Sequence, residues 1–261
     1  MTCSHQRWDL KNSNVFVNFN LLSCSWDDHY DIELKNFEQF EDEGDIWFGV
    51  SSEERIIKYL ASVETPKDVR ILDLGCGNGH FCLELTKRGY SSVTGVDYSE
   101  NAINLAFKLA EKHDLCDSLN FTCVDILSTE SINAFSPSSD NAYDIAIDKG
   151  TFDAITLIPD ATDPTRICEK SRDIYIQHTY RLLRPDATFI ITSCNWSADE
   201  LRQEFARPQT TNKAVRKVFE FVCEVPPIST FSFGGRTGAS TVCLVFKRLE
   251  LPSGEQIVTT H

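Results

Sequence analysis

Short apolar runs rich in β-branched residues alternate along the chain with longer stretches whose apolar residues recur at helical spacing. The short runs predict strands, and the stretches between them predict helices. Seven strands are expected, at residues 69–74, 92–97, 120–124, 143–147, 188–193, 219–225 and 241–247. The alternation is typical of an α/β fold with a parallel sheet and crossover helices. The last two strands have no helical pattern between them, so we expect them to pair as an antiparallel hairpin.

Local signals mark where several helices begin or end. The helix expected over residues 80–88 stops before Gly89, because glycine favours the left-handed position after a helix. Ser99 is a good N-cap for the helix after the second strand. A later helix is expected to run to about residue 183, where Pro185 prevents its continuation.

A glycine-rich loop follows the first predicted strand with the spacing Asp73-x-Gly75-x-Gly77-x-Gly79. The dinucleotide fingerprint needs two residues before its third glycine, and this loop has one. An acidic side chain just before the turn would repel phosphate and attract an ammonium group. The loop therefore indicates a nucleotide ligand that carries positive charge.

Two more acids follow the next strands. Asp97 ends the second strand, where an acidic side chain can accept both hydroxyls of a ribose, and Asp125 follows the third, where it could accept from an adenine amino group beside Ile126. A plain helix-capping role is the alternative for each acid taken alone. Together with Asp73 they predict one adenosine-binding crevice at the carboxyl ends of the strands.

Charge limits the range of partners. The 261 residues include 39 acids and 25 bases, for a net charge of −14. Such a surface repels a phosphate backbone, so no nucleic-acid partner is expected. Nine acids and one lysine lie in residues 27–45, which indicates either a solvated polar segment or a patch that steers a basic partner.

The sequence shows no segment that predicts a membrane location or secretion. No apolar run approaches the roughly 20 residues of a membrane span, and the first residues do not resemble a signal peptide. The ten cysteines form no C-x-x-C pair, so neither a metal nor a disulfide is expected. We expect a cytoplasmic monomer with no membrane partner, one domain at residues 25–249, and flexible tails at 1–24 and 250–261.

The loop, the strand-end acids and the strand pattern together resemble the class I S-adenosylmethionine-dependent methyltransferases. This resemblance implies a Rossmann-like sheet of order 3-2-1-4-5-7-6, with strand 7 antiparallel and helices on both faces. It also implies S-adenosylmethionine as the cofactor. The positions that it implies for cofactor binding are Trp47, Asp73, Leu74, Gly75, Cys76, Gly77, Gly79, Asp97, Tyr98, Asp125, Ile126 and Asp148.

The end of the fourth strand narrows the resemblance. It lacks the Asn/Asp-Pro-Pro-aromatic loop of enzymes that methylate adenine, cytosine or glutamine amides. Together with four other stretches it resembles the protein-lysine methyltransferases that act on translation elongation factor 1-alpha, which implies that factor as the protein substrate. The stretches are Trp26-Asp27 with Tyr30 and Glu33-Leu34, Ile46-Trp47-Phe48-Gly49, Asp148-Lys149-Gly150-Thr151-Phe152-Asp153, Thr192-Ser193-Cys194-Asn195-Trp196 and Phe231-Ser232-Phe233-Gly234-Gly235-Arg236.

The resemblance assigns candidate roles around the acceptor lysine. Asp148 is expected to orient the lysine as a hydrogen-bond acceptor and not to act as a strong base, because a carboxylate raises the pKa of a neighbouring amine. Phe152, Trp196 and Phe233 are expected to contact the substrate, since aromatic faces favour a cation. The alternative for each aromatic residue is a place in the core.

Other functions stay open at this stage. The chain could methylate another protein or a small molecule. An NAD-binding oxidoreductase is opposed by the glycine spacing. A binding module without activity is opposed by the intact acids Asp73, Asp97, Asp125 and Asp148.

Overall fold

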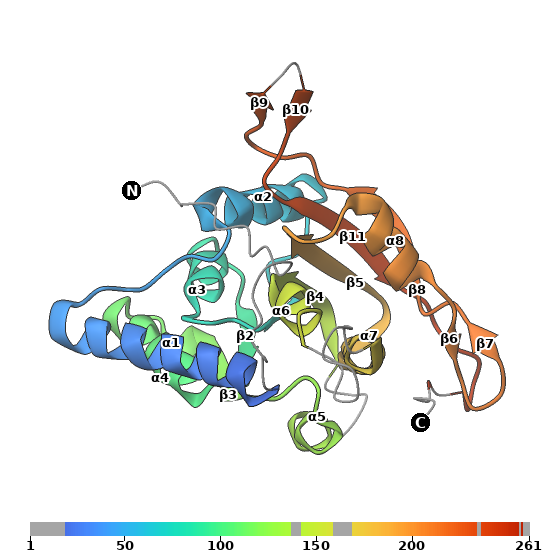
Figure 1. Cartoon of the computed structure of the whole chain (residues 1–261), viewed down its shortest axis with the longest axis horizontal. Coiled ribbons are helices and arrows are strands. Elements are labelled where there is room, and N and C mark those ends of the chain that lie inside the picture. The colour runs from blue at the N-terminus through green and yellow to red at the C-terminus, as the bar shows by residue number, and fades with distance from the viewer. Residues whose placement is uncertain (1–18, 137–141, 159–168, 234–235, 256, 258–261) are drawn as a thin grey trace, which may run out of the picture.

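The computed structural model of the chain describes residues 19–136, 142–158, 169–233, 236–255 and 257. Its main sheet has seven strands in the order β3-β2-β1-β4-β5-β11-β8 (Figure 1). Counted along this sheet, the order is the expected 3-2-1-4-5-7-6. The strands are β1 (Arg70–Leu74), β2 (Ser92–Asp97), β3 (Leu119–Cys123), β4 (Tyr143–Lys149), β5 (Leu183–Ser193), β8 (Phe219–Glu224) and β11 (Val242–Arg248). Neighbours from β3 to β5 are parallel, and β11 is antiparallel to β5 and β8, which confirms the hairpin.

Strand β5 begins earlier than the apolar pattern predicted. Its register with β4 shifts between Tyr143 and Ile145, so the segment from Arg184 to Ala187 bulges from the sheet. Asp186 lies in this bulge with φ of 63°. Aspartate tolerates the left-handed region better than most residues, so this position accepts it in place of glycine.

Helices cover both faces of the sheet (Figure 1). One face is covered by α2, α3 and α4, and α1 packs beside α4. The opposite face is covered by α5, α6, α7 and α8. The helices are α1 (Phe19–Phe40), α2 (Gly49–Ser62), α3 (His80–Lys87), α4 (Glu100–Lys112), α5 (Thr129–Phe135), α6 (Thr151–Ile155), α7 (Glu169–Leu182) and α8 (Ala198–Ala206).

Parts of both expected tails lie within the described residues. Helix α1 starts at Phe19, inside the segment 1–24, and residues 1–18 lie outside the described part. Near the other end, Ile257 pairs with Thr211 in an isolated bridge and accepts a hydrogen bond from Gln177. The described part of 250–257 is therefore held against the domain.

Two small antiparallel sheets, absent from the predicted pattern, extend from the main one. They are β6 (Gln209–Thr210) with β7 (Val215–Arg216), and β9 (Phe231–Phe233) with β10 (Arg236–Gly238). The β9–β10 hairpin occupies the link between β8 and β11 and projects beyond the main sheet near α2 (Figure 1).

Candidate functional site

The strand order reverses between β1 and β4, and the carboxyl ends of the parallel strands meet at that edge. Leu74 at the end of β1 pairs with Asp148 of β4, and Asp73 pairs with Gly95 of β2. Asp97 ends β2. Open α/β sheets bind ligands at this reversal, so the fold brings three of the predicted acids to the expected place.

The glycine loop after β1 requires glycine at its turns. Gly75, Gly77 and Gly79 all have φ between 54° and 75°, a region that disfavours other residues. A Cβ atom at Gly75 would lie 1.9 Å from Oγ1 of Thr151, and one at Gly77 would lie 2.3 Å from the Tyr30 hydroxyl. The loop is therefore packed between α6 and α1, with room only for backbone.

Asp97 is buried against this loop. Its carboxylate accepts hydrogen bonds from the amides of Gly77 and Ser99, both at 3.0 Å. Burial raises the pKa of Asp97 to about 6, although these amides lower it. The Ser99 hydroxyl accepts from the Ala102 amide, which confirms the predicted N-cap.

Asp73 is buried, with 2% of its surface exposed. It accepts a hydrogen bond from the Cys82 thiol at 3.5 Å, and a thiol is a weak donor. Burial raises the pKa of Asp73 to about 6, while the positive charge of Lys149 lowers it. The folded chain thus holds a carboxylate with acceptor capacity to spare, which suits an ammonium ligand.

The candidates after β2 and β3 lie at the surface of the same edge. Asp125 is exposed, and one of its oxygens accepts from the Leu127 amide at 2.8 Å. Ile126 is half-buried, and Tyr98 is 38% exposed. The Cys123 thiol donates to the Tyr98 carbonyl at 3.2 Å, which ties the ends of the two strands together.

Helix α1 and the segment after it contribute an aromatic cluster at the glycine loop. The Trp47 ring lies 4.7 Å from the Trp26 ring, and Tyr30 is buried beside them. Asn78 fastens the segment by donating to the carbonyls of Glu43 and Asp45. The charge pattern did not predict this aromatic cluster, because it marks residues 27–45 only as an acidic stretch.

Asp148 is buried near the carboxyl end of β4. Its side chain is fully buried, and one oxygen accepts from the amides of Gly150 and Thr151 at 2.9 Å. The other oxygen accepts from the Phe152 amide at 2.8 Å and from the Tyr175 hydroxyl. Burial raises the pKa of Asp148 to about 7, although the Tyr175 hydroxyl lowers it. With two donors on each oxygen, the carboxylate organises the start of α6, and this geometry opposes direct contact with a lysine.

Phe152 packs in the core, the alternative considered for each aromatic residue, and its substrate role stays a prediction. It has no exposed surface, and its ring lies 5.0–5.4 Å from the rings of Phe205, Tyr175 and Trp196. Trp196 is half-buried, and its indole N–H donates to Thr156 at 3.2 Å. The side chain of Phe233 lies outside the described part of the chain, so its expected role stays a prediction.

One further charged residue at the site, Glu53, escaped the sequence analysis. Glu53 of α2 is 1% exposed, and one of its carboxylate oxygens lies 2.8 Å from Nδ1 of His80. Its second oxygen lies 3.8 Å from Nζ of Lys149, which donates to the Trp47 carbonyl at 3.3 Å. No motif marked Glu53, and only an amphipathic pattern around Ile56, Ile57 and Leu60 could have placed its helix.

Asp153 joins the two loops that follow β4 and β5. One of its oxygens accepts from the Ser193 hydroxyl at 2.5 Å and the other from the Cys194 amide at 2.8 Å. The Ser193 oxygen then accepts from the amides of Asn195 and Trp196. The position of the Cys194–Trp196 loop therefore depends on Asp153, which appeared in the sequence only as the last letter of a motif.

Across the described residues, no group of three or more His, Cys, Asp or Glu side chains is placed to hold a metal ion. None of the helices in the same residues is long and apolar enough to cross a membrane.

The sheet order and its strand-end acids define a class I methyltransferase fold. A family model described as a methyltransferase domain matches residues 66–234. The chain is 38% identical to human EEF1A lysine methyltransferase 2 over 224 residues, which cover 86% of this chain and 84% of that protein. It is 34% identical to the protein-lysine N-methyltransferase Efm4 of Schizosaccharomyces pombe over 236 residues, which cover 85% and 91%. The chain belongs to this family of protein-lysine N-methyltransferases.

Solved structures agree on the fold alone. A magnesium protoporphyrin IX methyltransferase from Synechocystis with bound S-adenosylhomocysteine aligns with a TM-score of 0.54 at 14% identity, covering 87% of this chain and 99% of that one. The [4+2]-cyclase SpnF aligns with a TM-score of 0.54 at 15% identity, covering 89% and 97%. Since a cyclase shares the architecture, the fold by itself does not set the reaction.

Proposed function

We propose that the chain uses S-adenosylmethionine to methylate a lysine of translation elongation factor 1-alpha. The observation that carries the cofactor proposal is the pair of buried carboxylates, Asp73 and Asp97, on either side of the glycine loop. The acceptor is inferred from the relatives named above.

The residues fit this cofactor in charge and in shape. Burial raises the pKa of both Asp73 and Asp97 to about 6, so a cationic ligand would lower these values and gain binding energy. We assign Asp73 to the ammonium group and Asp97 to the ribose hydroxyls. Gly75 and Gly77 let backbone approach the ligand closely, because neither has room for a side chain.

Residues at the rim complete the cofactor site in this proposal. Asp125 keeps one carboxylate oxygen for an adenine amino group after the other accepts from Leu127. Ile126 and Tyr98 offer partly exposed apolar surface beside it. Trp47 packs against Trp26 of α1, the helix whose Tyr30 contacts the glycine loop at Gly77. When bound, S-adenosylmethionine supplies a methyl group on a positively charged sulfur.

The acceptor lysine must lose a proton before it can attack. At pH 7 this costs roughly 4.6 kcal/mol for a lysine of pKa about 10.4. Lys149 lies at the site with 12% of its side chain exposed, and a like charge lowers the pKa of an incoming lysine. In this mechanism the proton leaves to water, and Asp148 acts indirectly by holding the loop from Lys149 to Phe152.

The acidic surface favours a basic protein as substrate over a nucleic acid, given the net charge of −14. We also propose that the chain acts as a cytoplasmic monomer. Size-exclusion chromatography would test the monomeric state, and cell imaging would test the location.

One experiment tests the acceptor directly. The purified chain is incubated with methyl-labelled S-adenosylmethionine and either purified elongation factor 1-alpha or a cell lysate, and labelled sites are identified by mass spectrometry. Label on a lysine of the factor is expected. Label confined to another protein, to small molecules or to nucleic acid would overturn the proposed substrate.

A second measurement tests the cofactor. Calorimetry with S-adenosylmethionine should give binding that Asp97→Ala weakens, because its carboxylate is the proposed partner of the ribose. Ser62→Ala, at the far end of α2, serves as the control. Binding of NAD together with no signal from S-adenosylmethionine would contradict the assignment.

A further inference from the structure

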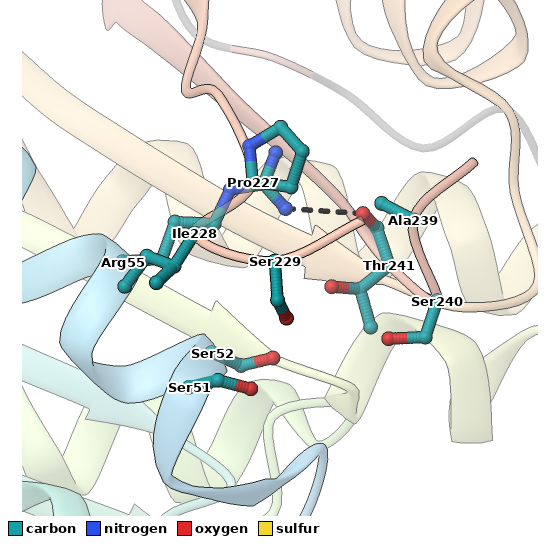
Figure 2. A pocket seen from close by; sticks show the side chains of 9 residues that line it. All are labelled: Ser51, Ser52, Arg55, Pro227, Ile228, Ser229, Ala239, Ser240 and Thr241. Carbon is teal, nitrogen blue, oxygen red and sulfur yellow. Dashed lines mark hydrogen bonds between the residues drawn. The ribbon is translucent and has the colours of Figure 1, made fainter. Parts of the chain in front are cut away.

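A small groove lies between the first turn of α2 and the two links that lead into and out of the β9–β10 hairpin (Figure 2). Together with the open solvent at its mouth, the empty space measures about 250 Å³. Arg55 fixes its walls, because the buried guanidinium donates to the carbonyls of Val225 and Thr241. These bonds hold both links against α2. The residues that line the groove are Ser51, Ser52, Arg55, Pro227, Ile228, Ser229, Ala239, Ser240 and Thr241.

The lining of the groove is rich in hydroxyl groups. Figure 2 shows Ser51 and Ser52 on α2, across from Ser229 and Thr241. Within the described residues, the side chains of Ser51, Ser229 and Ser240 make no hydrogen bond, and all three residues are exposed. A hydroxyl both donates and accepts, so it can pair with the N–H or the C=O of a polypeptide backbone.

The charges around the groove disfavour an ionic ligand. Among the described residues, no acidic side chain lines it, so none of them would hold the ammonium of a lysine. The cationic side chain in this described lining, Arg55, is occupied by the Val225 and Thr241 carbonyls. An uncharged extended segment of polypeptide is the chemistry that remains.

The groove adjoins the candidate site through the start of α2. Ser52 donates to the carbonyl of Phe48 at 3.0 Å, and the Phe48 ring lies over Gly150, where a Cβ would be 3.0 Å away. Ile228 in the lining exposes 45% of its surface, and Val50 and Trp47, which precede Ser51 in the chain, expose 54% and 40%. Exposed apolar side chains beside a groove commonly mark a protein-binding surface.

We propose that this groove binds the main chain of the protein substrate next to the lysine that is methylated. This inference rests on the proposed function. It adds a site for substrate recognition that is separate from the cofactor acids and lies one helical turn from Trp47.

The test fills the groove from either side with Ser51→Trp or Ser240→Trp, and uses Ser62→Trp at the other end of α2 as the matched control. Methylation of purified elongation factor 1-alpha is followed to obtain kcat and KM. Each groove variant should raise KM about tenfold, as expected for the loss of about 1.4 kcal/mol of binding, with a smaller effect on kcat. The control should keep the wild-type KM. Calorimetry with S-adenosylmethionine and thermal unfolding establish that each variant is folded.

The outcomes separate the two proposals. A wild-type chain that leaves the factor unmethylated overturns the proposed function, and this inference with it. An active wild-type chain whose two folded groove variants keep the wild-type KM overturns the inference alone. A wild-type KM that rises on addition of inorganic phosphate would instead indicate that the groove takes an anion, and would also overturn it.

Discussion

Replacing Phe152 separates a core role from contact with the substrate. The side chain has no exposed surface and lies among the rings of Tyr175, Trp196 and Phe205. Truncation of a buried phenylalanine to alanine typically costs about 3–5 kcal/mol. Each aromatic pair adds roughly 0.5–1.5 kcal/mol beyond its buried area, so Phe152→Ala should fall in the upper half of that range, near 4–5 kcal/mol.

Urea unfolding followed by circular dichroism measures this loss. Phe152→Leu keeps most of the volume and should cost about 1.5 kcal/mol or less, with most of the methylation activity retained. A direct role at the lysine would give the reverse pattern. The reasoning is refuted if Phe152→Leu abolishes activity while the free energy of unfolding of Phe152→Ala stays within about 1 kcal/mol of wild type.

Three further outcomes are expected. Gly75→Ala should weaken S-adenosylmethionine binding in calorimetry, because its Cβ would lie 1.9 Å from Oγ1 of Thr151 at a φ of 68°; wild-type affinity would contradict this. As the pH is raised towards 6, S-adenosylmethionine affinity should rise by up to about tenfold per pH unit and then level off, because Asp73, with a pKa of about 6, must lose its proton to bind an ammonium. Asp73→Asn should flatten this rise, and an equal rise in the variant would refute the assignment. Asp148→Ala should lower the free energy of unfolding by about 2–5 kcal/mol, since buried donors lose their acceptor, and Tyr175→Phe by less; a stable but inactive Asp148→Ala would indicate direct catalysis.

The central sheet follows from local pattern alone. Strands β1, β2 and β4 are buried on both faces, so they appear in the sequence as apolar runs without alternation. The N-cap at Ser99 was equally accessible, because capping depends on residues a few positions apart. The short strands of the β9–β10 hairpin escaped, since three residues carry too little periodicity to identify them.

The site was predicted less completely than the fold, and the reason is side-chain direction. The motif places Asp148 and Phe152 near the carboxyl end of β4, but it does not show that both side chains point into the core and contact Tyr175. Glu53 could not be found, because its partner His80 is brought to it by tertiary packing alone. The acids at strand ends were found because the carboxyl edge of a parallel sheet is fixed by topology.

A Cβ at Gly77 would lie 2.3 Å from the Tyr30 hydroxyl, so α1 packs against the glycine loop with no space for a side chain between them. Neither can change independently: a larger residue at position 77 would displace the helix, and a truncated α1 would leave the loop without the surface that supports it. Hydrogen exchange offers a direct view of this dependence. Removal of the Tyr30 ring should speed exchange of the Gly77 amide, which donates to Asp97. This result would reveal a link between α1 and the carboxylate that we propose binds the ribose.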